Sequence, residues 1–168
     1  MKRSIMRSIM AALPIMAVAG LPHAESALAQ DEKAPYWVSL RFDEVRMRVG
    51  PGLEYPIEWL YRRQGLPVKV LRVREGWSFV EDPDGAQGWI TSSQLSGTRT
   101  VIVIGEELAS LREEPSITSA LRWRAEPGVV GELLRCRETW CEISVTGRIG
   151  WVEAGLLWGD EDPPQAVP

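Results

Sequence analysis

The sequence predicts an all-β protein built from two small β-barrels in tandem. Short apolar segments alternate with turns rich in Gly, Pro and Asp, which is typical of a strand meander that curls on itself. The composition agrees, because 15 Gly, 12 Pro and eight Trp accompany many Val and Ile residues. Beyond the N-terminal region no apolar pattern keeps a 3.6-residue period, so we expect no long amphipathic helix.

An internal duplication predicts that the strands form two similar modules. The segment 68–95 (VKVLRVREGWSFVEDPDGAQGWITSSQL) recurs 62 or 63 residues later as 129–157 (VVGELLRCRETWCEISVTGRIGWVEAGLL). Each copy has an apolar strand, a polar turn, a Trp that opens the next strand, and a Gly-Trp step after a second turn. Several landmarks in the same order indicate duplication rather than chance. We place module one at 36–96 and module two at 106–158.

The segments outside the two modules have different characters. Residues 97–105 connect the modules, and the continuously apolar Thr100–Ile104 within them predicts a buried strand that is shared by the modules or bridges them. Residues 159–168 are acidic and rich in Pro, so we expect a disordered tail.

The first 29 residues have the features of an export signal. Lys2, Arg3 and Arg7 precede an apolar stretch from about residue 9 to residue 20, and Ala27-Leu28-Ala29 supplies a small-residue cleavage site. The apolar stretch is too short for a membrane-spanning helix, and no later segment is long enough. We therefore predict a signal peptide over 1–29, cleavage near Ala29, and a periplasmic or secreted protein with no membrane span.

Composition after residue 29 excludes several functional classes. The single His of the chain, His23, lies in the predicted signal, so the mature protein has no imidazole for acid–base catalysis or metal binding. Three of the 19 basic and one of the 23 acidic residues also lie there, which leaves a net charge of −6. A negative chain without a long basic run is not expected to bind nucleic acid. We expect no cofactor.

Cys136 and Cys141 are the only cysteines and predict a structural disulfide. Two thiols without His or further Cys form an incomplete tetrahedral metal site, and a redox pair usually has two intervening residues. Cys136 ends one expected strand and Cys141 begins the next, so a turn between them brings the thiols face to face. Export to an oxidising compartment favours the bond.

Several motifs resemble the bacterial SH3-like domain. Module one contains Met47-Arg48-Val49-Gly50-Pro51, Tyr55-Pro56, Gly76-Trp77 and Gly88-Trp89-Ile90. Module two resembles the partner module in exported tandem SH3-like proteins of Gram-negative bacteria, through Cys136, Trp140-Cys141, Gly150-Trp151 and Leu157-Trp158-Gly159. It departs from the pattern at Glu113-Glu114-Pro115 and lacks Tyr-Pro. The resemblance implies two small SH3-like β-barrels that bind cell-wall material or protein partners.

The candidate ligand-binding residues lie in and after the long first loop of module one. Tyr55, Trp59, Tyr61 and Arg62 combine aromatic faces with a guanidinium, a set able to stack on sugar rings or hold a peptide. The alternative is that these aromatics only close one end of the barrel. Four other Trp recur at matching places in the two copies and are interpreted as barrel structure: Trp77, Trp89, Trp140 and Trp151.

Catalysis has no recognisable basis in the sequence. Neither a Gly-x-Ser-x-Gly elbow nor a phosphate-binding loop is present, and the paired carboxylates lie in polar turns. We therefore predict a non-catalytic exported binding module that recognises a cell-wall peptide or glycan, or an envelope protein. The alternative is a structural scaffold protein of an envelope complex that binds no small ligand.

Overall fold

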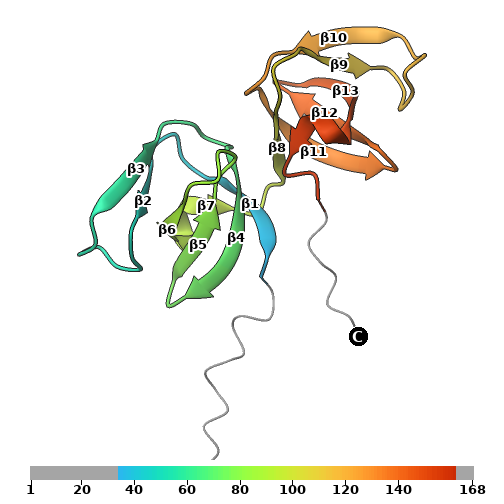
Figure 1. The fold of residues 1–168 in the computed structure, drawn as a ribbon. Coiled ribbons are helices and arrows are strands. Elements are labelled where there is room, and N and C mark those ends of the chain that lie inside the picture. The colour runs from blue at the N-terminus through green and yellow to red at the C-terminus, as the bar shows by residue number, and fades with distance from the viewer. Residues whose placement is uncertain (1–33, 162–168) are drawn as a thin grey trace, which may run out of the picture.

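The computed structural model describes residues 34–161, which form two curled sheets of seven strands each (Figure 1). The predicted signal peptide and most of the predicted disordered tail lie outside these residues. The strands of module one are β1 (Tyr36–Leu40), β2 (Val45–Arg48), β3 (Ile57–Tyr61), β4 (Pro67–Arg74), β5 (Trp77–Glu81), β6 (Gln87–Thr91) and β7 (Leu95–Ser96). Those of module two are β8 (Thr100–Val103), β9 (Ala109–Arg112), β10 (Leu121–Ala125), β11 (Val130–Arg137), β12 (Trp140–Val145), β13 (Arg148–Glu153) and β14 (Leu157–Trp158). Short 3-10 turns, η1 (Ser92–Gln94) and η2 (Ala154–Leu156), precede the last strand of each module.

The two sheets repeat one topology, as the duplication predicts. Module one has the strand order β3-β2-β6-β5-β4-β1-β7, and module two has the same order with every number raised by seven. All pairings are antiparallel. The fold is therefore all-β, but neither sheet closes into the barrel that we expected. Among residues 34–161 the end strands β3 and β7 do not pair with each other, and neither do β10 and β14.

Each module encloses its own apolar core. The core of module one collects buried side chains from β1, β2, β4, β5 and β6, chiefly Val38, Leu40, Val45, Met47, Val68, Val70, Val80 and Ile90. That of module two collects their counterparts, chiefly Val101, Val103, Leu111, Cys141, Ile143 and Val152. Alternation along the strands places every second residue in these cores.

Strand β8 belongs by hydrogen bonding to module two, yet it contributes to both cores. All four of its residues are buried. Val101 and Val103 face the core of module two, whereas Ile102 packs into that of module one. Thr100 points the same way as Ile102, and its hydroxyl donates to the Gly65 carbonyl at 2.7 Å. The buried strand predicted within 97–105 is thus the first strand of module two, and it is shared with the core of module one.

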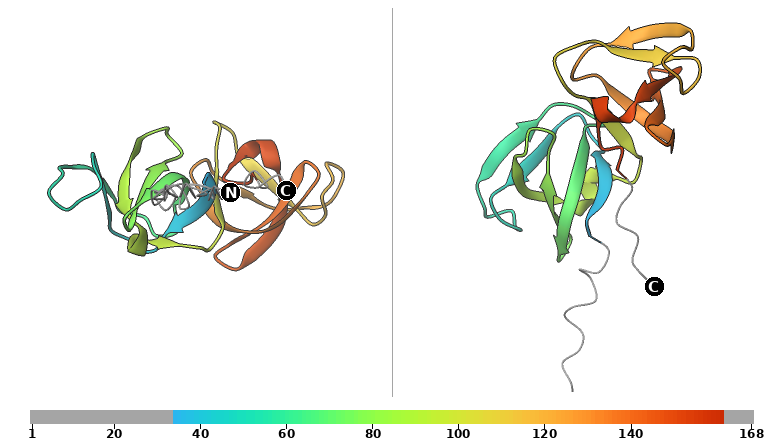
Figure 2. Two further views of the ribbon diagram at one scale, coloured as in Figure 1. Left: turned by 90° about the horizontal axis from the view of Figure 1, so that it is seen from below. Right: turned by 45° about the vertical axis from the view of Figure 1, so that its right-hand side comes forward.

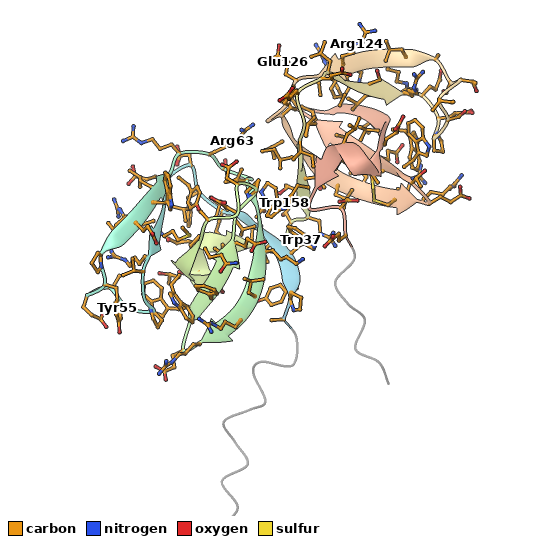
Figure 3. The ribbon with its side chains drawn as sticks, in the orientation of Figure 1. Trp37, Tyr55, Arg63, Arg124, Glu126 and Trp158 are labelled. Carbon is orange, nitrogen blue, oxygen red and sulfur yellow. A yellow bond between two sulfur atoms is a disulfide. The ribbon has the colours of Figure 1, made fainter. Side chains whose placement is uncertain are left out.

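The C-terminal end of module two lies against module one. The rings of Trp37 and Trp158 meet edge to face with centroids 4.5 Å apart, and Figure 3 shows the two side by side where the modules meet. Gly159 has φ +104 and approaches the Thr100 carbonyl so closely that a Cβ atom would lie 2.9 Å from its oxygen. Further views show the two sheets beside each other (Figure 2).

The structure differs from the sequence prediction at the start of the tail. The Arg99 guanidinium donates to the carbonyl oxygens of Gly159 and Glu161, both at 3.0 Å. The Glu161 carboxylate also pairs with Lys69 Nζ at 3.2 Å. Burial raises the pKa of the neighbouring Asp160 carboxyl. These contacts therefore hold residues 159–161 of the predicted tail in place, and the rest of that tail, 162–168, lies outside the described residues.

Candidate functional site

The loop between β2 and β3 places Tyr55 at the end of module one that lies away from module two (Figure 3). Arg48, the last residue of β2, donates from one guanidinium nitrogen to the carbonyl oxygens of Leu53 and Tyr55, at 3.1 and 2.6 Å. The Tyr55 ring lies directly against Gly50, where any Cβ atom would collide with it. The Gly-Pro landmark therefore allows an aromatic ring to pack on the loop backbone.

Trp59 and Tyr61 point to the opposite side of the sheet from Arg48. In the β2–β3 pair Trp59 lies opposite Met47 and Tyr61 opposite Val45, and both partners are core residues. A β-bulge at Glu58 then sets Ile57 opposite Arg48. Trp59 nevertheless remains 53% exposed, because β3 is the edge strand of the sheet and no further strand pairs with its outer side. The Tyr61 hydroxyl donates to the Asp82 carboxylate at 2.8 Å and is partly buried.

The four predicted binding residues have different surroundings along the edge strand and its flanking loops. Asp82 also accepts backbone N–H groups of the turn that follows β5, so Tyr61 ties the edge strand to that turn. Burial, followed by the hydrogen bond to Asp82, raises the Tyr61 pKa. Arg62 is exposed just after β3. Within residues 34–161 no hydrogen bond or ring contact joins any two of Tyr55, Trp59, Tyr61 and Arg62.

The exposed apolar side chains of module one gather around β2 and β3. Ile57 and Leu60 are exposed on one face of β3 and Trp59 on the other, and exposed loop residues lie before and after β2. The full set is Phe42, Val49, Leu53, Tyr55, Ile57, Trp59 and Leu60. Exposed apolar side chains that gather on an edge hairpin are typical of an interaction surface.

A row of arginine and aromatic side chains crosses the outer face of module one. In register across five strands lie Arg72, Phe79, Trp89, Arg48 and Ile57, which we call the module-one row. Directly opposed residues of neighbouring strands share one face of a sheet. The Arg72 guanidinium carbon lies 4.4 Å from the Phe79 ring centroid and 5.3 Å from that of Trp89. Both distances permit cation–π attraction.

A second β-bulge brings Arg72 to this outer face. Val70 faces the core and pairs with Val80, so simple alternation would turn Arg72 inward as well. The extra residue Leu71 shifts the register, and Arg72 pairs with the outward-facing Phe79. The bulge thus avoids a buried, unpaired guanidinium and creates the arginine–aromatic contact.

Module two carries the equivalent row on its own outer face. In register lie Arg135, Glu142, Trp151, Arg112 and Leu121, which we call the module-two row. The Arg135 guanidinium lies 5.2 Å from the Trp151 ring centroid. Its Nε also donates to the Glu142 carboxylate at 2.8 Å.

Comparison with known families matches both modules. The family model described as bacterial SH3 domain matches residues 42–97 and again residues 105–159. The chain belongs to the bacterial SH3 domain family. The resemblance read from the sequence motifs is thereby confirmed, and modules one and two are two such SH3 domains in tandem.

Two solved structures from Trichomonas vaginalis are also similar to the chain. NlpC2 is 16% identical with a TM-score of 0.34, and the alignment covers 75% of this chain and 48% of that one. NlpC1 is 17% identical with a TM-score of 0.34, with coverage of 74% and 46%. The chain thus spans about half the length of these proteins. No curated protein sequence matches it significantly.

The SH3 domain rows contain two of the recurring tryptophans. Trp89 and Trp151 are buried, but they lie on the outer faces beneath arginines rather than inside the two cores. Trp59 and Trp123 also prove equivalent, since they oppose the core residues Met47 and Leu111. The recurrence of Arg48 and Arg72 as Arg112 and Arg135, 64 and 63 residues later, is the sequence signal that could have revealed the rows.

The predicted disulfide between Cys136 and Cys141 is present in the second SH3 domain. The two residues are directly paired across the β11–β12 hairpin, with Cα atoms 4.0 Å apart. Their counterparts in the first domain, Val73 and Ser78, are paired in the same way.

The described part of the SH3 tandem presents aromatic, apolar and guanidinium side chains. Over residues 34–161 no three His, Cys, Asp or Glu side chains gather into a metal site. No helix in that range is long and apolar enough to cross a membrane. The available chemistry is aromatic stacking, apolar contact and charge-assisted hydrogen bonding from guanidinium groups.

Proposed function

We propose that this protein is an exported, non-catalytic binding module that recognises a cell-wall peptide or glycan, or an envelope protein, mainly through its first SH3 domain. The observation that carries the proposal is that the module-one row ends at Ile57 on β3, next to the loop between β2 and β3 with its exposed apolar side chains. Arg48 joins the row to the ordered loop that bears Tyr55. The export signal read in residues 1–29 supports a periplasmic or secreted location.

The second SH3 domain is less suited to the same ligand. Its first loop has Glu113 and Glu114 in place of Gly-Pro, and Glu113 pairs with Arg122 at 3.2 Å. In its row, Arg135 already has the Glu142 carboxylate as an ion-pair partner. Acidic loop residues repel acidic wall fragments, and the loop lacks an aromatic residue that could stack on a sugar.

A pull-down with purified peptidoglycan tests the proposal directly. Protein beginning at residue 30 should co-sediment with the wall, and Trp59→Ala should weaken retention several-fold, because truncating an aromatic anchor typically costs more than about 1 kcal/mol. Circular dichroism should show an intact β fold. If Trp59→Ala unfolds the domain, Trp59 is a core residue and the assignment is wrong.

Equivalent positions in the two rows supply a matched control. Ile57 and Leu121 are 47% and 44% exposed, so their truncation to alanine should cost similar stability. Ile57→Ala should weaken binding, and Leu121→Ala should not. The reverse result would place the site in module two.

A scaffold role in an envelope complex is the second candidate, and the shared core favours it. Ile102 and Trp158 of module two pack against module one, as expected of a rigid tandem that presents a fixed surface. A protein that does not sediment with peptidoglycan, and whose cross-links to an envelope protein in intact cells survive Trp59→Ala and Ile57→Ala, would support the scaffold role.

A further inference from the structure

The two rows differ in one position that decides their charge. Phe79 of module one and Glu142 of module two hold the same place, opposite Arg72 and Arg135 respectively. The Glu142 side chain is only 17% exposed, whereas that of Arg135 is 61% exposed. The carboxylate thus lies under the guanidinium edge, partly withdrawn from water, and its charge-assisted hydrogen bond is stronger than that of a fully exposed pair.

Arg72 also lies over aromatic rings, as Arg135 does, but within the described chain it has no carboxylate partner like Glu142. Among residues 34–161 no Asp or Glu lies within ion-pair distance of Arg72. Its guanidinium face is directed at aromatic rings, and stacking of this kind leaves the N–H groups in the guanidinium plane available. Arg48 in the same row is different, because its guanidinium donates to loop carbonyls.

We propose that Arg72 binds a carboxylate of the ligand. That carboxylate takes the place that the Glu142 side chain has beside Arg135 in module two. The inference rests on the proposed function and names the class of ligand: a peptide that carries a side-chain or terminal carboxylate, with an apolar portion directed along the row toward Ile57. The chain is acidic overall, with a net charge of −4, so its general field does not attract such a ligand. Recognition therefore depends on this local arrangement.

The first experiment compares soluble peptidoglycan fragments before and after their carboxylates are converted to methylamides. The native protein should bind untreated fragments roughly tenfold more tightly than blocked ones, as expected for a charge-assisted hydrogen bond. Arg72→Gln should remove that preference. Arg72→Lys should retain only part of it, because an ammonium lacks the planar edge. Equal affinity of the native protein for both fragment pools would overturn the proposal.

Exchanging the two decisive residues gives a second, independent test. Phe79→Glu places a carboxylate beside Arg72 as in module two, and should abolish binding of untreated fragments. Phe79→Gln also removes the ring but adds no charge, so it should lower affinity less. If the two variants bind equally well, loss of the ring explains the effect and the proposal fails. Glu142→Phe, combined with Glu113→Gln and Glu114→Gln to neutralise the first loop of module two, should raise the binding stoichiometry measured by calorimetry above that of a Glu113→Gln, Glu114→Gln control. An unchanged stoichiometry would contradict the role given to Glu142.

Failure of this inference can be told apart from failure of the proposed function. A protein that binds blocked and untreated fragments alike still binds the wall, so only the carboxylate assignment is lost. A protein that binds neither pool does not recognise wall fragments, and both the inference and the wall-binding part of the proposed function are overturned. Thermal unfolding of every variant confirms that a loss of binding comes from a folded protein.

Discussion

At the scale of single residues, Tyr61 shows how a candidate ligand contact can serve the fold instead. Its hydroxyl donates to Asp82, which is itself buried and accepts two backbone N–H groups. The side chain thereby fastens the edge strand β3 to the β5–β6 turn. Trp59, two residues earlier on the same face, has no such partner among the described residues and stays exposed. The two aromatics therefore differ in role although they look alike in the sequence.

The raised Tyr61 pKa predicts how stability depends on pH. Burial and the Asp82 hydrogen bond raise this pKa above its ordinary value of 10.0, so the folded protein keeps the proton after the unfolded chain has lost it. The contribution to stability is present below about pH 10 and is lost as the pH rises further. Urea unfolding should give a free energy that falls between pH 9 and 11.

Tyr61→Phe provides the comparison for this prediction. The variant should be about 1 kcal/mol less stable at pH 7, because it lacks the hydrogen bond to Asp82. Its free energy of unfolding should then fall less steeply between pH 9 and 11 than that of the native protein. Identical slopes would show that Tyr61 does not cause the alkaline loss.

At the scale of secondary-structure elements, strand identity was predictable but strand register was not. The turn residues, the Trp that opens a strand and the repeated Gly-Trp steps predicted the β5–β6 and β12–β13 hairpins, which the structure confirms. The bulges at Leu71 and Leu134 could not be predicted from these motifs, because a single extra residue in a strand changes neither the turn residues nor the Gly-Trp steps. They turn Arg72 and Arg135 outward, and so the rows were missed. The sequence motifs also do not predict that the sheets stay open. Whether the two end strands of a sheet pair with each other depends on how strongly the sheet curves, which the motifs do not determine.

The β11–β12 hairpin predicts a local effect of the disulfide. Replacing Cys136 by Val and Cys141 by Ser copies the residues that occupy these places in module one. Removing a disulfide that closes so short a loop should lower the free energy of unfolding by about 2 kcal/mol in the chain-entropy model. Urea unfolding of the double variant should match that of the native protein in dithiothreitol. A variant as stable as the oxidised native protein would show that the bond does not stabilise the hairpin.

At the scale of the whole molecule, the tandem is joined by more than a linker. Neighbouring residues of β8 point into different cores, with Val101 and Val103 in module two and Ile102 in module one. The Thr100–Gly65 hydrogen bond and the Trp37–Trp158 contact lie on the same junction. Because β8 is hydrogen-bonded to β11 and β14, unfolding of module two withdraws Ile102 from the core of module one.

This arrangement predicts that the two modules unfold together. Ile102→Ala removes a buried side chain from module one and should cost about 2–4 kcal/mol, and Val101→Ala should cost somewhat less through module two. Both variants should move one common unfolding transition, followed in parallel by calorimetry and by tryptophan fluorescence. Ile104, which is exposed beyond the end of β8, supplies the control, and Ile104→Ala should leave that transition nearly unchanged. Two separate transitions, with Ile102→Ala moving only one of them, would mean that the modules fold independently despite the shared strand.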